Sequence, residues 1–359
     1  MRWRTSCGDY DQPVEANPGL KLLGSLVGLL IRGLLALPDG LMKRVFGDPP
    51  PEARGLMPDA WALGRLTAIS EGSDPDFVLE KSRGELELMA RAASLPAAGV
   101  RSERWILEGD GRNLQARLFT PPGVHGRTPL LVHFHGGGFV QGSIGTHAGA
   151  CSWLALGTGV RVLSVGYRLA PEHPFPAQAE DALLAWRSVM RDPARFGADP
   201  ARVGVIGDSA GAQMATVLCL DLKAAGEPQP AAQFLVYPVT DCTGSMPSRD
   251  RFATGYYLTR NRIEWFESCF VDREDAGDPR ASPLFAEDLS GLAPALVSLS
   301  IADPLRDEGL AYAERMIEAG VPVTVDHMPL LHSWFNVTAS RSSRKGHEVL
   351  ASRVNELLG

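Results

Sequence analysis

Four short runs of almost uninterrupted apolar residues, at 129–134, 160–166, 202–206 and 232–238, constrain the fold of this chain more than any other feature. Strands that are buried on both faces of a parallel sheet have this composition. Helix-length stretches separate the runs, and parallel strands need such stretches for their crossover connections. The sequence therefore predicts an α/β protein built around a parallel sheet.

Four further runs complete the predicted sheet, at about 103–107, 113–119, 295–300 and 322–327. The first two lie too close together for a crossover helix between them, so we expect them to pair in an antiparallel manner. The resulting fold class is α/β, with an eight-stranded, mostly parallel sheet flanked by helices.

The N-terminal part of the chain has no strand pattern. Helical patterns occur near 18–37, 39–47 and 76–94, with Pro- and Gly-rich breakers between them. The interval between the sixth and seventh strands exceeds fifty residues, which is too long for one helix and indicates an insertion. We expect a helical segment over 1–100, an α/β domain over 101–359, and an insertion within that domain at about 241–285.

The segment 22–37 (LLGSLVGLLIRGLLAL) is strongly apolar, but Arg32 interrupts it. A membrane-spanning helix needs about 18 or more apolar residues, so we predict no transmembrane segment. Acidic residues such as Asp9 and Asp11 stand where a secretory signal carries positive charge. We expect a helix packed on the protein itself, with contact to a membrane surface and a targeting signal as the alternatives.

Charge and cysteine content exclude several classes of protein. The chain has 42 acidic and 35 basic residues, a formal net charge of -7 and no long basic run, which argues against a nucleic-acid partner. Its five cysteines are scattered without C-x-x-C spacing, so a disulfide framework is not expected. Reduced thiols favour a cytoplasmic protein.

The sharpest chemical motif is GDSAG at 207–211, which lies between the strand at 202–206 and a helical run at 212–218. In that context the flanking glycines let two backbones pass closely, and the serine hydroxyl projects from a tight turn. Ser209 is therefore the predicted nucleophile. We expect Asp208 to form local hydrogen bonds and to take no part in proton transfer.

A serine hydroxyl becomes a good nucleophile only when a base takes its proton, and in hydrolases of this type the base follows later in the chain. Three histidines follow Ser209. His332 lies in the loop after the eighth strand and is preferred. His327 falls at the end of that strand, and His347 lies in a charged C-terminal helix, where we expect a solvated face.

The carboxylate that orients the base is expected directly after the seventh strand, where Asp303 stands. Asp307 and Glu308 compete on proximity, but both fall in the first turn of the following helix, where acids usually complement the helix dipole. Asp303 is therefore preferred. The resulting chain order of nucleophile, acid and base is that of the α/β-hydrolase fold.

An oxyanion forms when a serine attacks a carbonyl group, and backbone amides usually stabilise it. The amide of Ala210 supplies one donor, and the HGGG loop at 135–138 is expected to supply the others. His133 and His135 are spaced so that they could hold a metal, but no motif provides further ligands. We therefore interpret His133 as a core residue and expect no metal or other cofactor.

In combination, these motifs resemble the hormone-sensitive-lipase-like branch of the α/β-hydrolase esterases, also called bacterial family IV. The resemblance covers about residues 100–340. It rests on HGGG at 135–138, YRLAPE at 167–172, GDSAG at 207–211, DPLRDE at 303–308 and the loop around His332.

This resemblance implies that Gly137 and Gly138 donate to the oxyanion together with Ala210, and that His135 and Gly136 shape the loop. It also implies that the N-terminal helices and the insertion form a helical cap over the pocket, and that two copies pair through the eighth strand as a homodimer. One departure is that Ser333-Trp334 stands where the family usually has glycine and phenylalanine.

We predict a carboxylesterase that hydrolyses short to medium acyl esters through an acyl-enzyme, with a small-molecule ester and a second copy of the chain as its expected partners. The expected pocket residues are Phe139, Val140, Tyr256, Tyr257 and Trp334. The alternatives are an amidase or lactonase with the same triad, and a non-catalytic ligand-binding protein of the same fold. Such receptors lack the catalytic histidine, so the presence of His332 favours an enzyme.

Overall fold

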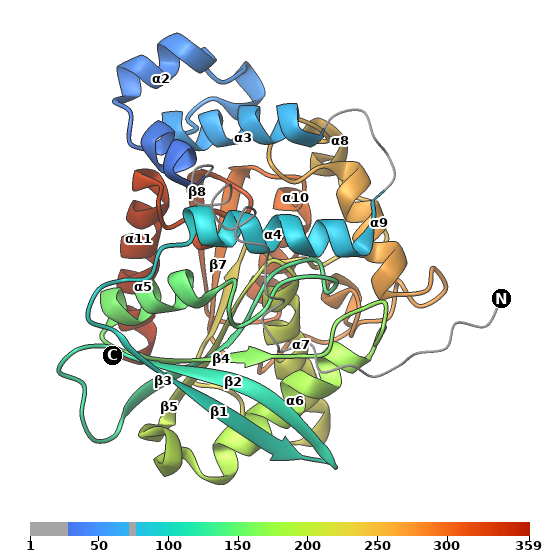
Figure 1. Cartoon of the computed structure of the whole chain (residues 1–359). Coiled ribbons are helices and arrows are strands. Elements are labelled where there is room, and N and C mark those ends of the chain that lie inside the picture. Colours follow the sequence, from blue (N-terminus) through green and yellow to red (C-terminus); the bar gives the residue numbers. More distant parts are fainter. Residues whose placement is uncertain (1–27, 72–76) are drawn as a thin grey trace.

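The computed structural model describes residues 28–71 and 77–359, and within these ranges eight strands form one sheet (Figure 1). The strands are β1 (Arg101–Gly109), β2 (Arg112–Thr120), β3 (Thr128–Phe134), β4 (Arg161–Gly166), β5 (Ala198–Asp208), β6 (Gln233–Val236), β7 (Ala295–Ala302) and β8 (Val323–Leu331). Their order is β1-β2-β4-β3-β5-β6-β7-β8. Only β2 runs antiparallel to its neighbours, and the other pairings are parallel. The predicted α/β-hydrolase sheet is confirmed.

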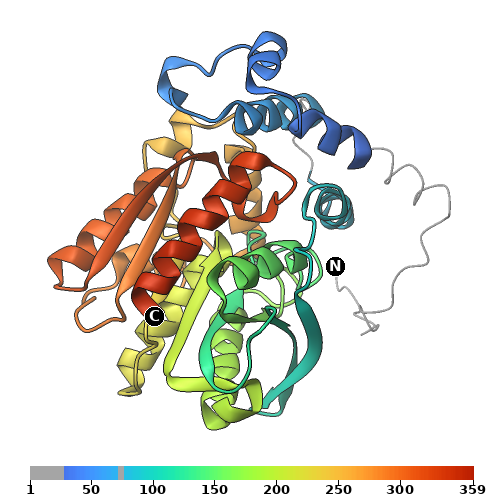
Figure 2. The same cartoon turned by 90° about the vertical axis from the view of Figure 1, so that its left-hand side faces the viewer.

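Helices cover both faces of this sheet. One group is α6 (Ala177–Arg191), α7 (Ala210–Ala225) and α10 (Arg306–Glu318), and the other is α5 (Ala148–Thr158) and α11 (Arg341–Leu358), whose side faces the viewer in Figure 2. Alternate residues of a strand point to opposite faces. On β3, Leu130, Val132 and Phe134 pack with the first group, whereas Leu131 packs with the second. Burial on both faces explains the uninterrupted apolar runs in the sequence.

Several strands, among them β1, β2, β5 and β8, are longer than their apolar runs, because the ladder of backbone hydrogen bonds continues through polar residues. The β1–β2 hairpin pairs as far as Gly109 and Arg112. The two residues between them, Asp110 and Gly111, have φ values of 48° and 72°, as a tight hairpin turn requires. At the other edge, β8 continues to Leu331, so the predicted base follows the strand directly.

Helices from two separate parts of the chain lie together at one end of the sheet (Figure 1). We refer to them as the overlying helices: α2 (Asp39–Phe46), α3 (Pro58–Glu71), α4 (Leu79–Ala93), α8 (Ser248–Arg251) and α9 (Arg260–Phe270). The last two belong to the insertion between β6 and β7. Short 3-10 segments are η1 (Pro51–Ala53), η2 (Pro193–Phe196), η3 (Pro283–Phe285) and η4 (Trp334–Asn336).

The helix α3 was not expected from the sequence, and a buried carboxylate holds it in place. Asp59 in its first turn accepts hydrogen bonds from Ser340 Oγ (2.7 Å) and from the amide of Ser342 (3.1 Å). Both partners lie at the start of α11, where a negative charge also complements the helix dipole. Ser342 is therefore buried.

The expectation of a solvated His347 was wrong. The residue is only 3% exposed; its Nε2 lies 2.8 Å from the carbonyl oxygen of Phe335, and its ring stacks on the Phe335 ring. Burial lowers the pKa of His347 to about 4, so the imidazole is neutral near pH 7. The sequence did contain the signal, because His347 lies three residues before Leu350 and seven before Val354, on one helix face.

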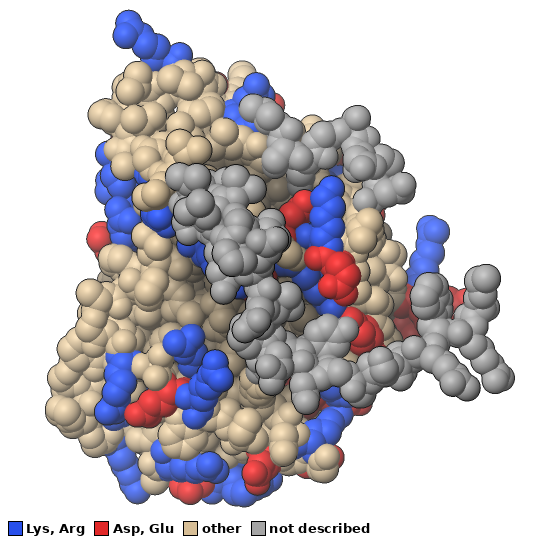
Figure 3. Space-filling view, viewed as in Figure 1, with Lys and Arg blue, Asp and Glu red and all other residues tan. Residues whose placement is uncertain are grey.

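Of the apolar segment 22–37, residues 22–27 lie outside the described ranges, and 28–35 are helical. Leu35 is buried, whereas Leu29 and Leu30 are 59% and 74% exposed. The face around α2 is largely uncharged, whereas basic and acidic side chains intermingle near β1 and β2 (Figure 3). Within the described ranges, no helix combines the length and apolar composition needed to cross a bilayer. Contact of this segment with a membrane surface stays a prediction.

Candidate active site

Ser209 stands at the turn between β5 and α7. Its φ of 57° is a left-handed conformation, which is strained for any residue other than glycine. The backbones on either side pass very closely: a Cβ on Gly207 would lie 2.1 Å from Gly211 O, and a Cβ on Gly211 would lie 2.0 Å from Phe134 O. Only glycine fits at these two positions, and the turn they permit aims the serine hydroxyl away from the sheet.

A chain of hydrogen bonds links Ser209 to two other predicted residues. His332 Nε2 lies 2.9 Å from Ser209 Oγ, and His332 Nδ1 lies 2.8 Å from Asp303 Oδ2. The other oxygen of Asp303 accepts from the amide of Leu305 at 2.9 Å, which fixes the carboxylate. With the Nδ1 proton donated to Asp303, Nε2 is left as an acceptor for the serine proton.

The alternative acids and base lie elsewhere. His327 is exposed on β8. Asp307 pairs with Arg306 at 2.7 Å. Glu308, expected to complement a helix dipole, is instead fully buried and accepts from the amide of Thr240 at 2.9 Å. The three residues preferred from the sequence are the ones that the structure brings together.

The glycine loop after β3 forms a tight turn in which Gly137 O accepts from the amides of Val140 (3.1 Å) and Gln141 (3.0 Å). Gly137 and Gly138 have φ values of 126° and 60°. A Cβ on Gly137 would lie 2.1 Å from Gln141 O, and a Cβ on Gly138 would lie 2.3 Å from the Phe266 ring. Side chains are therefore excluded from this turn, and its backbone lines the same cavity as Ser209.

Ala210, the residue after Ser209, is the first residue of α7. The first amides of a helix have no acceptor within the helix, and the partial positive charge of the helix dipole is concentrated there. This end of α7 therefore offers a donor and a favourable field to a negatively charged oxygen.

Buried polar residues hold the glycine loop in place through hydrogen bonds. Asp208 Oδ1 accepts from the amide of Gly136 at 3.0 Å, and the His133 and His147 Nε2 atoms lie 3.4 and 3.5 Å from its carboxylate. Burial alone would raise the pKa of Asp208, but the two histidines outweigh it and hold the pKa well below its usual range. His135 Nδ1 lies 2.9 Å from Gly136 O, and burial lowers the pKa of His135 to about 3, so the imidazole is neutral.

Comparison with known proteins identifies the family. The family model described as alpha/beta hydrolase fold matches residues 131–336, which is more than half of the chain. The chain belongs to the α/β-hydrolase family.

Relatives of this hydrolase include the carboxylic ester hydrolase LipN of Mycobacterium tuberculosis, which is 40% identical over 272 residues, or 74% of this chain and 72% of LipN. An ethyl acetate hydrolase of Pseudomonas putida is 41% identical over 226 residues, covering 61% of this chain and 70% of the relative.

Among solved structures, a thermostable esterase from Pseudomonas putida matches with a TM-score of 0.81 and 29% identity, over 87% of this chain and 99% of the esterase. An ester hydrolase from the metagenome of Lake Arreo matches with a TM-score of 0.77 and 36% identity, over 86% and 98% of the two chains. The hydrolase is thus a carboxylesterase of the hormone-sensitive-lipase-like branch.

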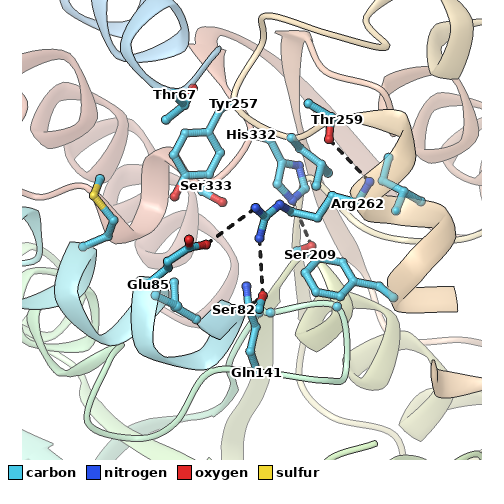
Figure 4. A pocket seen from close by; sticks show the side chains of 18 of the residues that line it. Thr67, Ser82, Glu85, Gln141, Ser209, Tyr257, Thr259, Arg262, His332 and Ser333 are labelled. Carbon is cyan, nitrogen blue, oxygen red and sulfur yellow. Dashed lines mark hydrogen bonds and ion pairs between the residues drawn. The ribbon is translucent and has the colours of Figure 1, made fainter. Parts of the chain in front are cut away.

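The esterase has a cavity of about 470 Å³ between Ser209 and the overlying helices (Figure 4). Aromatic rings on its wall are those of Phe77, Phe139, Tyr257 and Phe266. Polar side chains on its wall include those of Thr67, Ser82, Gln141, Thr259, Arg262 and Ser333. The cavity therefore offers both apolar surface and hydrogen-bonding groups to a ligand.

Only part of the predicted pocket lines this cavity. Phe139 and Tyr257 do, whereas Val140, Tyr256 and Trp334 are buried and lie outside its described wall. Ser333 adopts a left-handed φ of 67°, and the turn carries Trp334 into the core. The expected tryptophan wall was therefore wrong, and Ser333 faces the cavity instead.

Sequence reasoning missed several polar residues at the site. Ser82 Oγ donates to Gln141 Oε1 at 2.7 Å, and Arg262 Nη1 lies 3.4 Å from Ser82 Oγ (Figure 4). Arg262 also lies 3.8 Å from the carboxylate of Glu85. These residues come from α4, the glycine loop and α9, and no local motif marks them. Only Gln141 could have been predicted to lie at the site, because it follows the triple glycine closely in the sequence.

Proposed function

We propose that this carboxylesterase acts through an acyl-enzyme formed on Ser209, with His332 as general base and acid and Asp303 as its orienting carboxylate. The observation that carries the proposal is the unbroken chain of hydrogen bonds from Ser209 Oγ through His332 to Asp303, at 2.9 and 2.8 Å. Nucleophile and base lie within direct hydrogen-bonding distance, as this chemistry requires.

In the first half of the reaction, His332 Nε2 takes the hydroxyl proton while Ser209 Oγ bonds to the ester carbonyl carbon. The tetrahedral intermediate then collapses. The bond to the leaving alkoxide breaks, and the alkoxide receives the proton from Nε2. In the second half, His332 Nε2 takes a proton from water while the water oxygen bonds to the acyl carbonyl carbon. The bond to Ser209 Oγ then breaks, Oγ receives the proton from Nε2, and the acid is released.

We propose Gly137, Gly138 and Ala210 as the amides that stabilise the oxyanion. Their support is the side-chain-free turn of the glycine loop and the unsatisfied first amide of α7. Gly136, His135 and Asp208 hold this loop through the hydrogen bonds described above.

We further propose short to medium acyl esters as substrates, with the overlying helices acting as a cap. This proposal is supported by a cavity of about 470 Å³, a size typical of pockets for small ligands, whose wall includes residues of α3, α4 and α9.

The test is a series of p-nitrophenyl esters from acetyl through octanoyl to palmitoyl, assayed with the wild type, Ser209→Ala and a matched control, Ser268→Ala. Ser268 lies on α9, and its hydroxyl donates to Trp265 O of the same helix. We expect turnover of the shorter esters, no turnover by Ser209→Ala and normal turnover by Ser268→Ala. Faster hydrolysis of the matching p-nitroanilides would identify an amidase, and binding of the esters without turnover would favour the ligand-binding alternative.

Two finer proposals concern location and assembly. We propose that the enzyme works in the cytoplasm, because the described cysteines Cys151, Cys219, Cys242 and Cys269 are all unpaired. We propose a homodimer paired through β8, since β8 forms an edge of the sheet. Light scattering on the purified protein measures its molar mass and so tests the homodimer directly.

A further inference from the structure

The glycine loop is anchored from two different parts of the molecule. Its first half is held by the α/β domain: Tyr167 Oη donates to His135 O at 2.7 Å, and the amide of Ala170 donates to Phe139 O at 2.9 Å. These contacts lie beneath the loop and come from the segment that follows β4.

The end of the loop, at Val140 and Gln141, is held by α4, one of the overlying helices. Ser82 Oγ donates to Gln141 Oε1 at 2.7 Å, and both residues are largely buried, with exposed fractions of 4% and 8%. The next residue, Arg83, donates from Nε to Val140 O at 2.9 Å. Its two terminal nitrogens bind Glu172 at 2.7 and 2.8 Å, which fixes the guanidinium plane.

The held end of the loop is coupled tightly to the proposed oxyanion amides. The amides of Val140 and Gln141 both donate to Gly137 O, and Gln141 O lies so close to Gly137 that a Cβ there would be 2.1 Å away. Because there is no free space between these backbones, a shift at Gln141 is transmitted to Gly137.

We propose that Ser82 and Arg83 are positioning residues that hold the oxyanion-binding amides in place, so that α4 acts on the chemical step as well as on binding. This inference rests on the oxyanion role proposed for Gly137 and Gly138. Arg262, whose Nη1 lies 3.4 Å from Ser82 Oγ, brings α9 into the same set of contacts. The two parts of the overlying helices, represented by α4 and α9, therefore meet at Ser82, which holds the glycine loop.

A purely structural contact and a positioning contact have different kinetic consequences. If Ser82 only stabilised α4 or shaped the pocket, its loss would lower the melting temperature or raise KM. If it positions donors that act on the oxyanion, its loss lowers kcat and weakens binding of a tetrahedral adduct by a similar factor, with little change in KM.

The experiment compares Ser82→Ala and Arg83→Met with the controls Ser268→Ala and Arg91→Met. Arg91 lies on the same helix as Arg83, is 70% exposed and pairs with Glu87 across one helical turn. For each variant, kcat and KM are measured on p-nitrophenyl butyrate, and Ki is measured for an alkyl trifluoromethyl ketone, which adds to a serine to form an oxyanion.

We expect Ser82→Ala to lower kcat about tenfold and to raise the ketone Ki by a similar factor, with KM within about twofold of wild type. Arg83→Met should act in the same direction, and both controls should match wild type. An unchanged kcat with an unchanged ketone Ki would overturn the inference, as would a loss confined to KM.

A second measurement covers the case in which Ser82→Ala fails to fold. Gln141→Met removes the acceptor from the loop side, and it should produce the same loss of kcat. Where both single variants fold, the double variant should be no slower than the worse single variant, because the two side chains form one contact. Additive losses would contradict a shared contact. If Ser209→Ala kept full activity, the proposed mechanism itself would fail, which is a result distinct from any outcome at Ser82.

Discussion

Replacing Gly137 with alanine is the sharpest test of the geometry of the glycine loop. A Cβ at this position would lie 2.1 Å from Gln141 O, whereas real Cβ atoms essentially never approach another heavy atom within 3.0 Å. The neighbouring group is backbone, so it cannot rotate away as a flexible side chain could. The two chain segments must therefore separate by about 1 Å, and the amide of Gly137 moves with them.

A displacement of that size has a defined expected effect on the rate. A misplacement of about 1 Å costs on the order of 10²-fold, and complete loss of one oxyanion donor costs about 10²- to 10³-fold. We therefore expect Gly137→Ala to lower kcat on p-nitrophenyl butyrate by about 10²-fold or more. The left-handed φ of 126° adds backbone strain, which we expect to lower stability by roughly 1–3 kcal/mol.

Gly123→Ala is the matched control. Gly123 also has a positive φ, of 77°, but no heavy atom lies within 4 Å of a Cβ built on it. Its substitution adds backbone strain without a clash, so urea unfolding should detect the strain cost of roughly 1–3 kcal/mol while kcat stays at the wild-type value. If Gly137→Ala retained kcat within about threefold of wild type, the close approach of the loop would not matter for catalysis, and the argument would be refuted.

Three other predictions concern charges. Asp303→Asn should lower kcat by about 10⁴-fold, because an amide no longer holds His332 in its reactive tautomer; steady-state kinetics measure this, and equal losses in Asp303→Asn and Asp307→Asn would contradict the assignment. Glu308→Ala should destabilise the fold by about 3 kcal/mol in urea unfolding, since buried Arg249 loses a partner at 3.0 Å; a cost no larger than that of Asp307→Asn would count against it. Burial lowers the pKa of His347 to about 4 from 6.5, so protonation favours the unfolded chain and stability is lost as pH falls through that window. Between about pH 8 and about pH 5, the free energy of unfolding of His347→Leu should therefore fall by about 2 kcal/mol less than that of the wild type. An identical pH dependence in variant and wild type would disprove the neutral buried imidazole.

The sheet and the positions of the proposed triad could be predicted from the sequence because their signals are local. Strands buried on both faces must be apolar throughout, so β3 and β4 stand out as uninterrupted runs. The turn at Ser209 admits only glycine at Gly207 and Gly211, because the neighbouring backbones come within 2.1 Å of any added Cβ. The positions of Asp303 and His332 follow from strand ends, since parallel strands bring their carboxyl ends to one edge.

The wall of the cavity and the supports of the loop were decided by tertiary structure alone. Trp334 turns into the core because Ser333 takes a left-handed φ, a backbone choice that no side-chain pattern announces. Ser82 meets Gln141 across 59 residues of sequence, and their contact exists only because α4 packs over the glycine loop. A sequence motif reflects which residues the backbone conformation admits within a few positions. Contacts between helices that are distant in the sequence depend on how those helices pack. The sequence by itself therefore determined the fold and the placement of Ser209, His332 and Asp303, and the packing of the overlying helices decided the shape of the pocket and the supports of the glycine loop.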